Sequence, residues 1–185
     1  LKQETLGYKV ITVGSSAGGF NAVIMGQLLN AERIYSFNGQ FEINSLLGST
    51  TAMINPIIFR NRSIDNLRPY FDTLNFINRP TSIYYFHSNK SKWDLEQLAH
   101  VTNTKLNVVK FATSNHGLPF LKSNLATVLN LPLDQLNLLS GKTYHPLLFS
   151  LKIVGIVNTF KGLIPILKFI LNKTYINTIQ KLKVK

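Results

Sequence analysis

Short apolar runs that alternate with helical patterns constrain this chain more than any other feature of its sequence. Four runs rich in Val, Ile, Tyr and Phe have the length of buried strands, at residues 8–13, 33–37, 82–87 and 106–112. Helical patterns lie between or after them, at residues 18–29, 94–102 and 119–129. Strands that alternate with helices form parallel βαβ units with right-handed crossovers. The sequence therefore predicts an α/β fold, with a mostly parallel sheet and flanking helices.

Residues 40–80 interrupt this rhythm with a stretch rich in Asn, Ser and Arg, with aromatic residues interspersed. Insertions of this kind in an α/β enzyme often cover the site, and a packed helical excursion is as common. Both interpretations stay open from the sequence. The chain is long enough for one domain with a sizeable core, which we place at residues 1–140, with 40–80 as an insertion or lid.

The first strand-like run leads directly into a turn of small residues. Residues 14–18 read Gly-Ser-Ser-Ala-Gly, a G-x-S-x-G pattern between a strand and a helix. In this context the tight turn exposes the central hydroxyl, which predicts Ser16 as a nucleophile. The Ala17 N–H would donate to an oxyanion from the helix N-terminus, and Gly18 would contact the substrate. A helix N-cap serine and a nucleotide-binding glycine turn are the alternatives, and the second lacks G-x-G-x-x-G.

A serine nucleophile needs a histidine base, and the sequence offers four histidines. His116 follows the run 106–112 through a short loop, and Gly117 leaves its imidazole room to approach. A neutral imidazole with a pKa of about 6.5 can take the serine proton and return it to the leaving group. We therefore predict His116 as the general base. His87 ends another strand-like run and is predicted to line the substrate pocket.

The acid that orients the base should lie between the serine and the histidine in the chain. Asp94 follows the third strand-like run and precedes a helical pattern, at the expected carboxyl end of the sheet. This position predicts Asp94 as the acid, with a helix N-cap role as the alternative and Glu96 as the fallback. The order disfavours three others, which lie in the insertion or after the base: Asp65, Asp72 and Asp134.

These segments together resemble the α/β-hydrolase superfamily over residues 8–130. The runs 13–20, 83–87, 93–94 and 115–119 are similar to a group of bacterial hydrolase-like proteins associated with surface-polysaccharide assembly. That resemblance implies an acyl ester as substrate, either a small ester or an O-acylated glycan.

The chain departs from the superfamily pattern ahead of the serine turn. In the superfamily several strands precede this turn, and a loop after an early strand supplies a second oxyanion donor. Here only the run 8–13 precedes it. We therefore expect the C-terminal part of such a fold, N-terminally incomplete, with its first strand as an exposed edge.

A basic tail follows the predicted domain. Residues 141–185 carry eight Lys and no Asp or Glu, whereas residues 1–140 carry twelve Lys or Arg against eight acids. The apolar segment 147–171 contains Lys161 near its middle, which makes a membrane span costly by about 3 kcal/mol. An amphipathic helix on a membrane surface and a helix packed on the domain both stay open. The chain has no cysteine, and we expect a cytoplasmic protein, peripheral to the inner face of the membrane.

The sequence thus predicts a serine esterase or acyl-transferring enzyme that acts through an acyl-enzyme intermediate. This chemistry requires no cofactor and no metal, and the basic residues are not joined to a motif that reads nucleic acid. The expected partners are the ester substrate and a membrane surface, contacted through 147–171. The alternative is a non-catalytic binding or assembly protein on a hydrolase scaffold, attached to a membrane or anionic glycan by its tail.

Overall fold

A five-stranded parallel sheet forms the centre of the molecule. A computed structural model describes residues 1–48, 50–78 and 81–183, with side chains as far as residue 173. The strands lie side by side in chain order. They are β1 Ile11–Ser15, β2 Arg33–Phe37, β3 Ser82–Ser88, β4 Asn107–Phe111 and β5 Thr143–Tyr144. The predicted α/β fold with a parallel sheet is confirmed.

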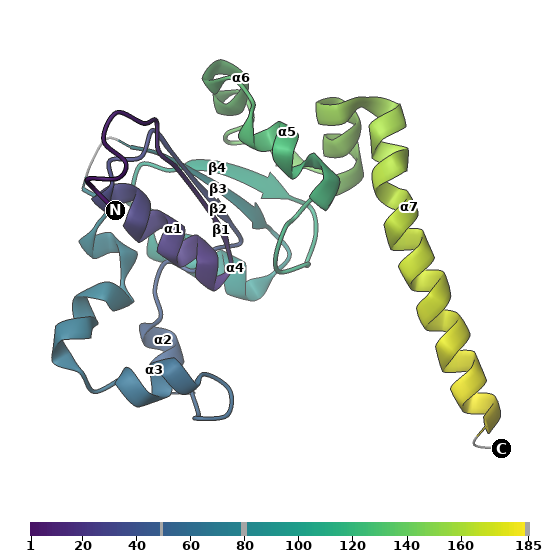
Figure 1. Cartoon of the computed structure of the whole chain (residues 1–185), viewed down its shortest axis with the longest axis horizontal. Helices are drawn as coiled ribbons and strands as arrows, with labels where there is room; N and C mark the ends of the chain where they lie inside the picture. The colour runs from purple at the N-terminus through teal and green to yellow at the C-terminus, as the bar shows by residue number, and fades with distance from the viewer. Residues whose placement is uncertain (49, 79–80, 184–185) are drawn as a thin grey trace.

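Helices cover both faces of this sheet (Figure 1). α1 Ala17–Leu28 and α4 Lys92–His100 lie on one face. α5 Leu125–Leu129, α6 Leu133–Asn137 and the start of α7 Pro146–Lys183 lie on the other. Sheets of this kind are buried on both faces, which explains why the strands appear in the sequence as nearly uninterrupted apolar runs.

Successive side chains of the central strands point to opposite faces of the sheet. Ile34 of β2 and Ile83 of β3 join Val23 of α1 in one buried cluster. Their neighbours Tyr35 and Tyr84 belong to the larger cluster on the other face. Polar residues at the carboxyl ends of these strands are thereby held at the rim of a well-packed core.

The two edges of the sheet are unequal. β1 forms one edge, as predicted, and Ile11 and Val13 are 42% and 44% exposed there. The other edge is β5, whose two residues pair with Lys110 and Phe111 of β4. The sequence did not predict β5, because two residues are too few to show a periodic pattern.

The described part of residues 40–80 consists of short helices. They are α2 Asn44–Leu47, α3 Pro56–Asn61 and the 3-10 helices η1 Asp65–Phe71 and η2 Thr73–Asn75. The insertion is tied to α4, since Nε2 of His100 lies 2.9 Å from both carboxylate oxygens of Asp72. Oε1 of Gln97 also accepts a hydrogen bond from the backbone N–H of Phe41 at 2.6 Å. The segment therefore packs on the domain as a helical excursion, and its role as a lid stays a prediction.

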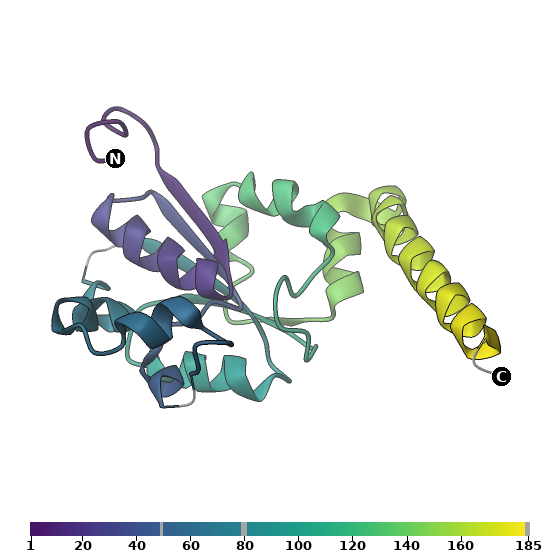
Figure 2. The same cartoon turned by 60° about the horizontal axis from the view of Figure 1, so that its bottom comes forward.

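α7 begins inside the core and ends far from it. Phe149 is buried in the larger apolar cluster, and Nδ2 of Asn124 donates to the buried Ser150 Oγ at 2.6 Å. The core thus extends beyond residue 140, where the tail was predicted to begin. At Gly155 the backbone turns to φ 76° and ψ 174°, which breaks the helix. Beyond this break α7 changes direction and extends away from the sheet (Figure 2). We call residues 156–183 the arm.

Candidate active site

Ser16 occupies a strained turn between β1 and α1. Its φ and ψ are 54° and −124°, values that cost a non-glycine residue about 1–3 kcal/mol. The turn is held by backbone hydrogen bonds, because the Ser16 N–H donates to the Phe37 carbonyl at 3.1 Å and its own carbonyl accepts from Gly19 at 2.9 Å. The helix N-cap alternative finds no support, because the Ser16 side chain makes no capping hydrogen bond.

Glycines allow the chain to approach itself closely at this turn. A Cβ on Gly14 would lie 1.9 Å from the Gly18 carbonyl oxygen, and one on Gly19 would lie 2.6 Å from Cα of Gly39. A Cβ on Gly18 would meet nothing within 4 Å. Gly14 and Gly19 are therefore the sterically required glycines. Gly18, predicted to contact substrate, is exposed beside Ser16, and that role stays a prediction.

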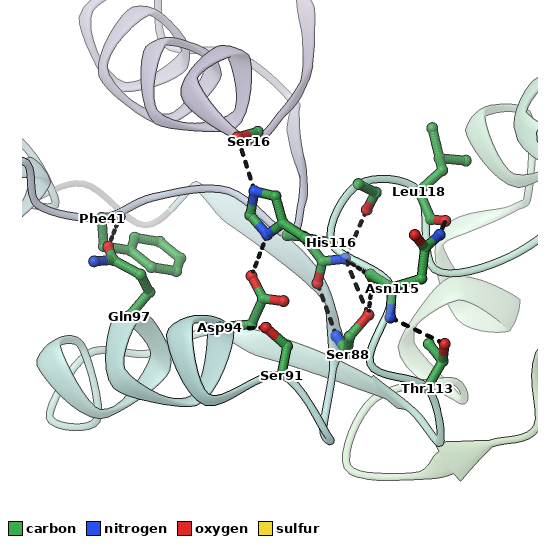
Figure 3. Close-up of polar contacts among 12 residues, drawn as sticks. Ser16, Phe41, Ser88, Ser91, Asp94, Gln97, Thr113, Asn115, His116 and Leu118 are labelled. Carbon is green, nitrogen blue, oxygen red and sulfur yellow. Dashed lines mark hydrogen bonds and ion pairs between the residues drawn. The ribbon is translucent and has the colours of Figure 1, made fainter. Parts of the chain in front are cut away.

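Three side chains from separate segments form a chain of hydrogen bonds (Figure 3). Oγ of Ser16 lies 2.9 Å from Nε2 of His116, and Nδ1 of His116 lies 2.8 Å from Oδ1 of Asp94. Since Nδ1–H must donate to the carboxylate, Nε2 is the nitrogen left to accept the serine proton. The predicted convergence at the carboxyl ends of parallel strands is confirmed. The strands that precede the three residues are β1, β3 and β4, and β2 lies between the first two.

The Asp94 carboxylate is fully buried. Ser91 caps α4 and accepts from the Asp94 N–H at 3.4 Å, so the alternative of Asp94 as the N-cap is wrong. Asp94 lies in the first turn of the helix, where the helix dipole favours a negative charge. Its second oxygen, Oδ2, has no hydrogen-bond partner among the described residues. The imidazole of His116 is therefore the hydrogen-bond partner of this carboxylate among the described residues.

A buried asparagine fixes the loop that carries His116. Nδ2 of Asn38 donates to the carbonyls of Asn115 and Gly117, at 3.1 and 2.7 Å, and to Ser88 Oγ at 3.0 Å. These carbonyls belong to the two neighbours of His116, so one amide group holds the loop on both sides of the base. Asn38 itself has a φ of 43°, a left-handed conformation that asparagine tolerates better than most residues.

Ser88 completes this support. Its N–H donates to Oδ1 of Asn38 at 2.7 Å, and its hydroxyl donates to the Asn115 carbonyl at 2.6 Å. The sequence did not predict a role for either Asn38 or Ser88. The available signal was their position, since Asn38 directly follows β2 and Ser88 ends β3, at the edge of the sheet where the site lies.

His87 does not line the site. Its side chain is fully buried and stacks on Tyr85, with ring centroids 5.2 Å apart and an interplanar angle of 1°. The prediction of His87 as a pocket residue is therefore wrong, because its side chain points into the sheet–helix interior. Neither ring nitrogen has a hydrogen-bond partner in the described structure. Burial lowers the pKa of His87, and the nearby Asp94 carboxylate opposes that shift only in part.

Ala17 is the first residue of α1. Its backbone N–H consequently has no acceptor within the helix and is available to an external group. With the helix dipole behind it, this N–H suits an oxyanion formed next to Ser16. Among the described residues, no group of three or more His, Cys, Asp or Glu side chains could hold a metal ion.

A cavity of about 1290 Å³ opens beside His116. One wall is the loop that follows His116, and the other is α7, with Ser15 at the end nearest the nucleophile. The described part of residues 40–80 adds no side chain to this lining. The surface next to the imidazole is thus shaped by the C-terminal helix.

Comparisons with known proteins add only a partial likeness in fold. No protein-family model and no curated protein matches the sequence. Among solved structures, the apoenzyme of S-formylglutathione hydrolase from Staphylococcus aureus is similar, with a TM-score of 0.42 and 11% sequence identity. The alignment covers 54% of this chain and 45% of that chain. The chain is therefore similar to part of a hydrolase, at a level that leaves its activity to be argued from the site.

Proposed function

We propose that the protein is a serine hydrolase of the esterase or acyl-transfer type. The observation that carries this proposal is the unbroken chain of hydrogen bonds from Ser16 through His116 to Asp94. Ser16 lies on a strained strand-to-helix turn, the geometry that exposes a serine hydroxyl for attack. An ordinary structural serine needs neither the strain nor a histidine held by a buried carboxylate.

The reaction follows from these positions. Ser16 Oγ attacks the ester carbonyl carbon, and its proton passes to Nε2 of His116. The bond to the leaving alcohol breaks as His116 returns that proton to the alcohol oxygen, leaving an acyl group on Ser16. Water, or a second alcohol, then attacks the acyl-enzyme by the same proton transfers and restores the serine. Hydrolysis gives one acid and one alcohol, and acyl transfer gives a new ester.

Two charges develop during this reaction, and each has a partner. The buried Asp94 carboxylate stabilises the imidazolium form of His116, which exists only while the proton is in transit. The Ala17 N–H at the start of α1 stabilises the oxyanion. Following the resemblance of the sequence to polysaccharide-associated hydrolases, we propose a small ester or an O-acylated glycan as substrate.

Labelling by a fluorophosphonate probe tests this function. Ser16→Ala should abolish labelling and lower ester turnover by several orders of magnitude, on the order of 10⁴-fold or more, because the triad acts as one unit. His116→Ala should lower turnover nearly as much, and Asp94→Asn should be milder or comparable, because it disturbs the tautomer without removing the base. Asp65→Asn, an exposed residue outside the site, should stay within about tenfold of wild type. Wild-type turnover in Ser16→Ala would exclude the proposal.

A second candidate function is favoured by the exposure of α7. Pro146–Lys173 is, within the described residues, the one helix long and apolar enough to cross a membrane, and only 6% of its most apolar 18-residue window is buried. Because Gly155 breaks this helix and Lys161 interrupts it, we propose that it lies on an anionic membrane surface at the cytoplasmic face. A protein attached in this way could act as a non-catalytic scaffold, and the labelling experiment separates the two functions.

A further inference from the structure

The cavity beside His116 is larger than an acetyl ester requires. Its volume is about 1290 Å³, whereas pockets for drug-sized ligands commonly span about 300–1,000 Å³. The surface that lines it is mostly apolar, and the apolar side chains come from both walls, among them Leu118, Pro119, Phe120, Val154, Pro165, Ile166 and Phe169. A cavity of this size and character suits a long apolar chain that begins next to the nucleophile.

Lysines give this cavity a single sign of charge. Lys122 lies on the loop wall and Lys161 on the α7 wall, and both are exposed to solvent. No Asp or Glu is among the described residues that line it. An apolar cavity with cations and no anions is complementary to an amphiphile that carries a negative charge.

The arm of α7 has two different faces. The residues that line the cavity recur every three or four positions, which places them on one side of the helix: Asn158, Lys161, Gly162, Pro165, Ile166 and Phe169. A second set with the same spacing lies on the far side, and we name it the outer stripe. Its exposed members are Val157, Phe160, Ile164, Leu167 and Leu171. One helix therefore walls the cavity with one face and presents an apolar surface with the other.

The α7 wall of the cavity packs closely against the loop wall. A Cβ on Gly162 would lie 2.2 Å from Oγ of Ser123, so the arm contacts the loop wall closely at this point. Asn124, on the same wall, is bonded to Ser150 on the first part of α7. The cavity is thus a built feature of the fold, closed on one side by the helix whose outer stripe is apolar.

From these features we propose that the substrate is an anionic amphiphilic ester taken from a membrane. Its apolar acyl chain lies in the cavity, its carbonyl carbon at Ser16, and its anionic group at the rim near Lys122 and Lys161. This inference rests on the proposed hydrolase function and, in place of the small ester or O-acylated glycan that the resemblance implies, assigns an anionic membrane-derived ester as the substrate class. If the outer stripe lies on a lipid surface, the helix that walls the cavity holds the cavity close to the lipid from which the chain is taken.

The test compares soluble substrates below their micelle concentrations. Wild-type protein should cleave lauroyl lysophosphatidylglycerol with a kcat/KM about tenfold or more above that for lauroyl lysophosphatidylcholine, because one ionic contact of about 1.4 kcal/mol is tenfold. Lys161→Gln should remove most of that ratio. Lys168→Gln, a lysine on the same helix that does not line the cavity, should leave the ratio unchanged.

Chain length gives the second arm of the test. Val154→Trp fills the cavity and should lower the kcat/KM ratio of p-nitrophenyl laurate to p-nitrophenyl acetate at least about tenfold. Val157→Trp is the matched control, because Val157 is exposed on the outer stripe. If the wild type prefers neither the anionic lipid over the zwitterionic one nor the laurate ester over the acetate ester, while the probe still labels Ser16, the proposed substrate class is wrong and the proposed hydrolase function is retained. If Ser16 is not labelled, the function itself fails.

Discussion

At the scale of single residues, Asn38 fixes the position of the loop that carries the base, His116. Its side-chain amide donates to the backbone on both sides of His116, although it touches neither Ser16 nor the imidazole in any contact described. Asn38 is thus a positioning residue, which acts through the loop.

Replacing Asn38 by Asp tests this role. The carboxylate has no N–H to donate and would set a negative oxygen against the carbonyls of Asn115 and Gly117. We expect kcat to fall roughly 10- to 100-fold, with KM changed much less, because small misplacements of a catalytic group are costly. Asn130→Asp, at an exposed position, should leave both constants near wild type. An equally large change in KM, or an unchanged kcat, would argue against a positioning role for Asn38.

His87 predicts a pH dependence of stability. Burial lowers the pKa of His87 in the folded state below its ordinary value of 6.5, so below that pH the unfolded chain binds the proton more readily. The contribution of neutral His87 is therefore complete above about pH 6.5 and is lost as the pH falls through the lowered pKa.

The matching variant is His87→Phe, which keeps a ring to stack on Tyr85 and removes the titrating group. In urea unfolding at pH 7.5 and 5.5, the wild type should lose more free energy of unfolding than this variant. His145→Gln, at an exposed position, should keep the wild-type pH dependence. Equal losses in wild type and His87→Phe would show that His87 does not titrate as proposed.

At the scale of elements, α7 joins two environments in one helix. Phe149 is fully buried, whereas Phe160 is 63% exposed. Phe149→Ala should lower the free energy of unfolding by about 3–5 kcal/mol, and Phe160→Ala should change it by no more than about 0.5 kcal/mol. Urea unfolding of both variants measures the difference. Similar losses would mean that the arm is packed in solution.

Elements with a strong local pattern could be predicted from the sequence, and those set by distant partners could not. β2 was predicted with its observed bounds, because Ile34, Tyr35 and Phe37 give it a mostly apolar pattern and the strand is buried on both faces. The helix expected at 119–129 instead divides into the 3-10 helix η3 Lys122–Asn124 and α5. Asn124, where η3 ends, is bonded to Ser150 of α7, a contact that the local pattern does not show.

The same distinction holds for the site. Ser16, Asp94 and His116 could be predicted because each follows a strand whose carboxyl end must meet the others at one edge. His87 was placed wrongly because its side chain lies on the same face of β3 as that of Tyr85 and is covered there by packed helices. The sequence alone does not show that this face is covered as far as His87. The Asn38 support and the α7 wall depend on contacts between segments far apart, which spacing along the chain does not show.

At the scale of the whole molecule, the outer stripe and the lysines of α7 predict membrane binding. The protein should sediment with vesicles that contain phosphatidylglycerol and be released at about 1 M salt, where the screening length is about 3 Å. A Phe160→Ser, Leu167→Ser double variant should lose this binding. The matched control is Met53→Ser with Ile57→Ser, two exposed apolar residues of the insertion. Equal binding by both double variants would show that α7 is not the anchor.

The bond between Ser16 and His116 joins residues that are 100 positions apart in the chain. Contacts of such high sequence separation form late in folding, because the entropy of closing a long loop is lost before the contact stabilises the chain. β1, β3 and β4 must all be in place before the imidazole can reach the hydroxyl. Reactivity of Ser16 during refolding should therefore follow the slowest phase, and a ribosome-bound chain that ends before β4 should be chemically inert.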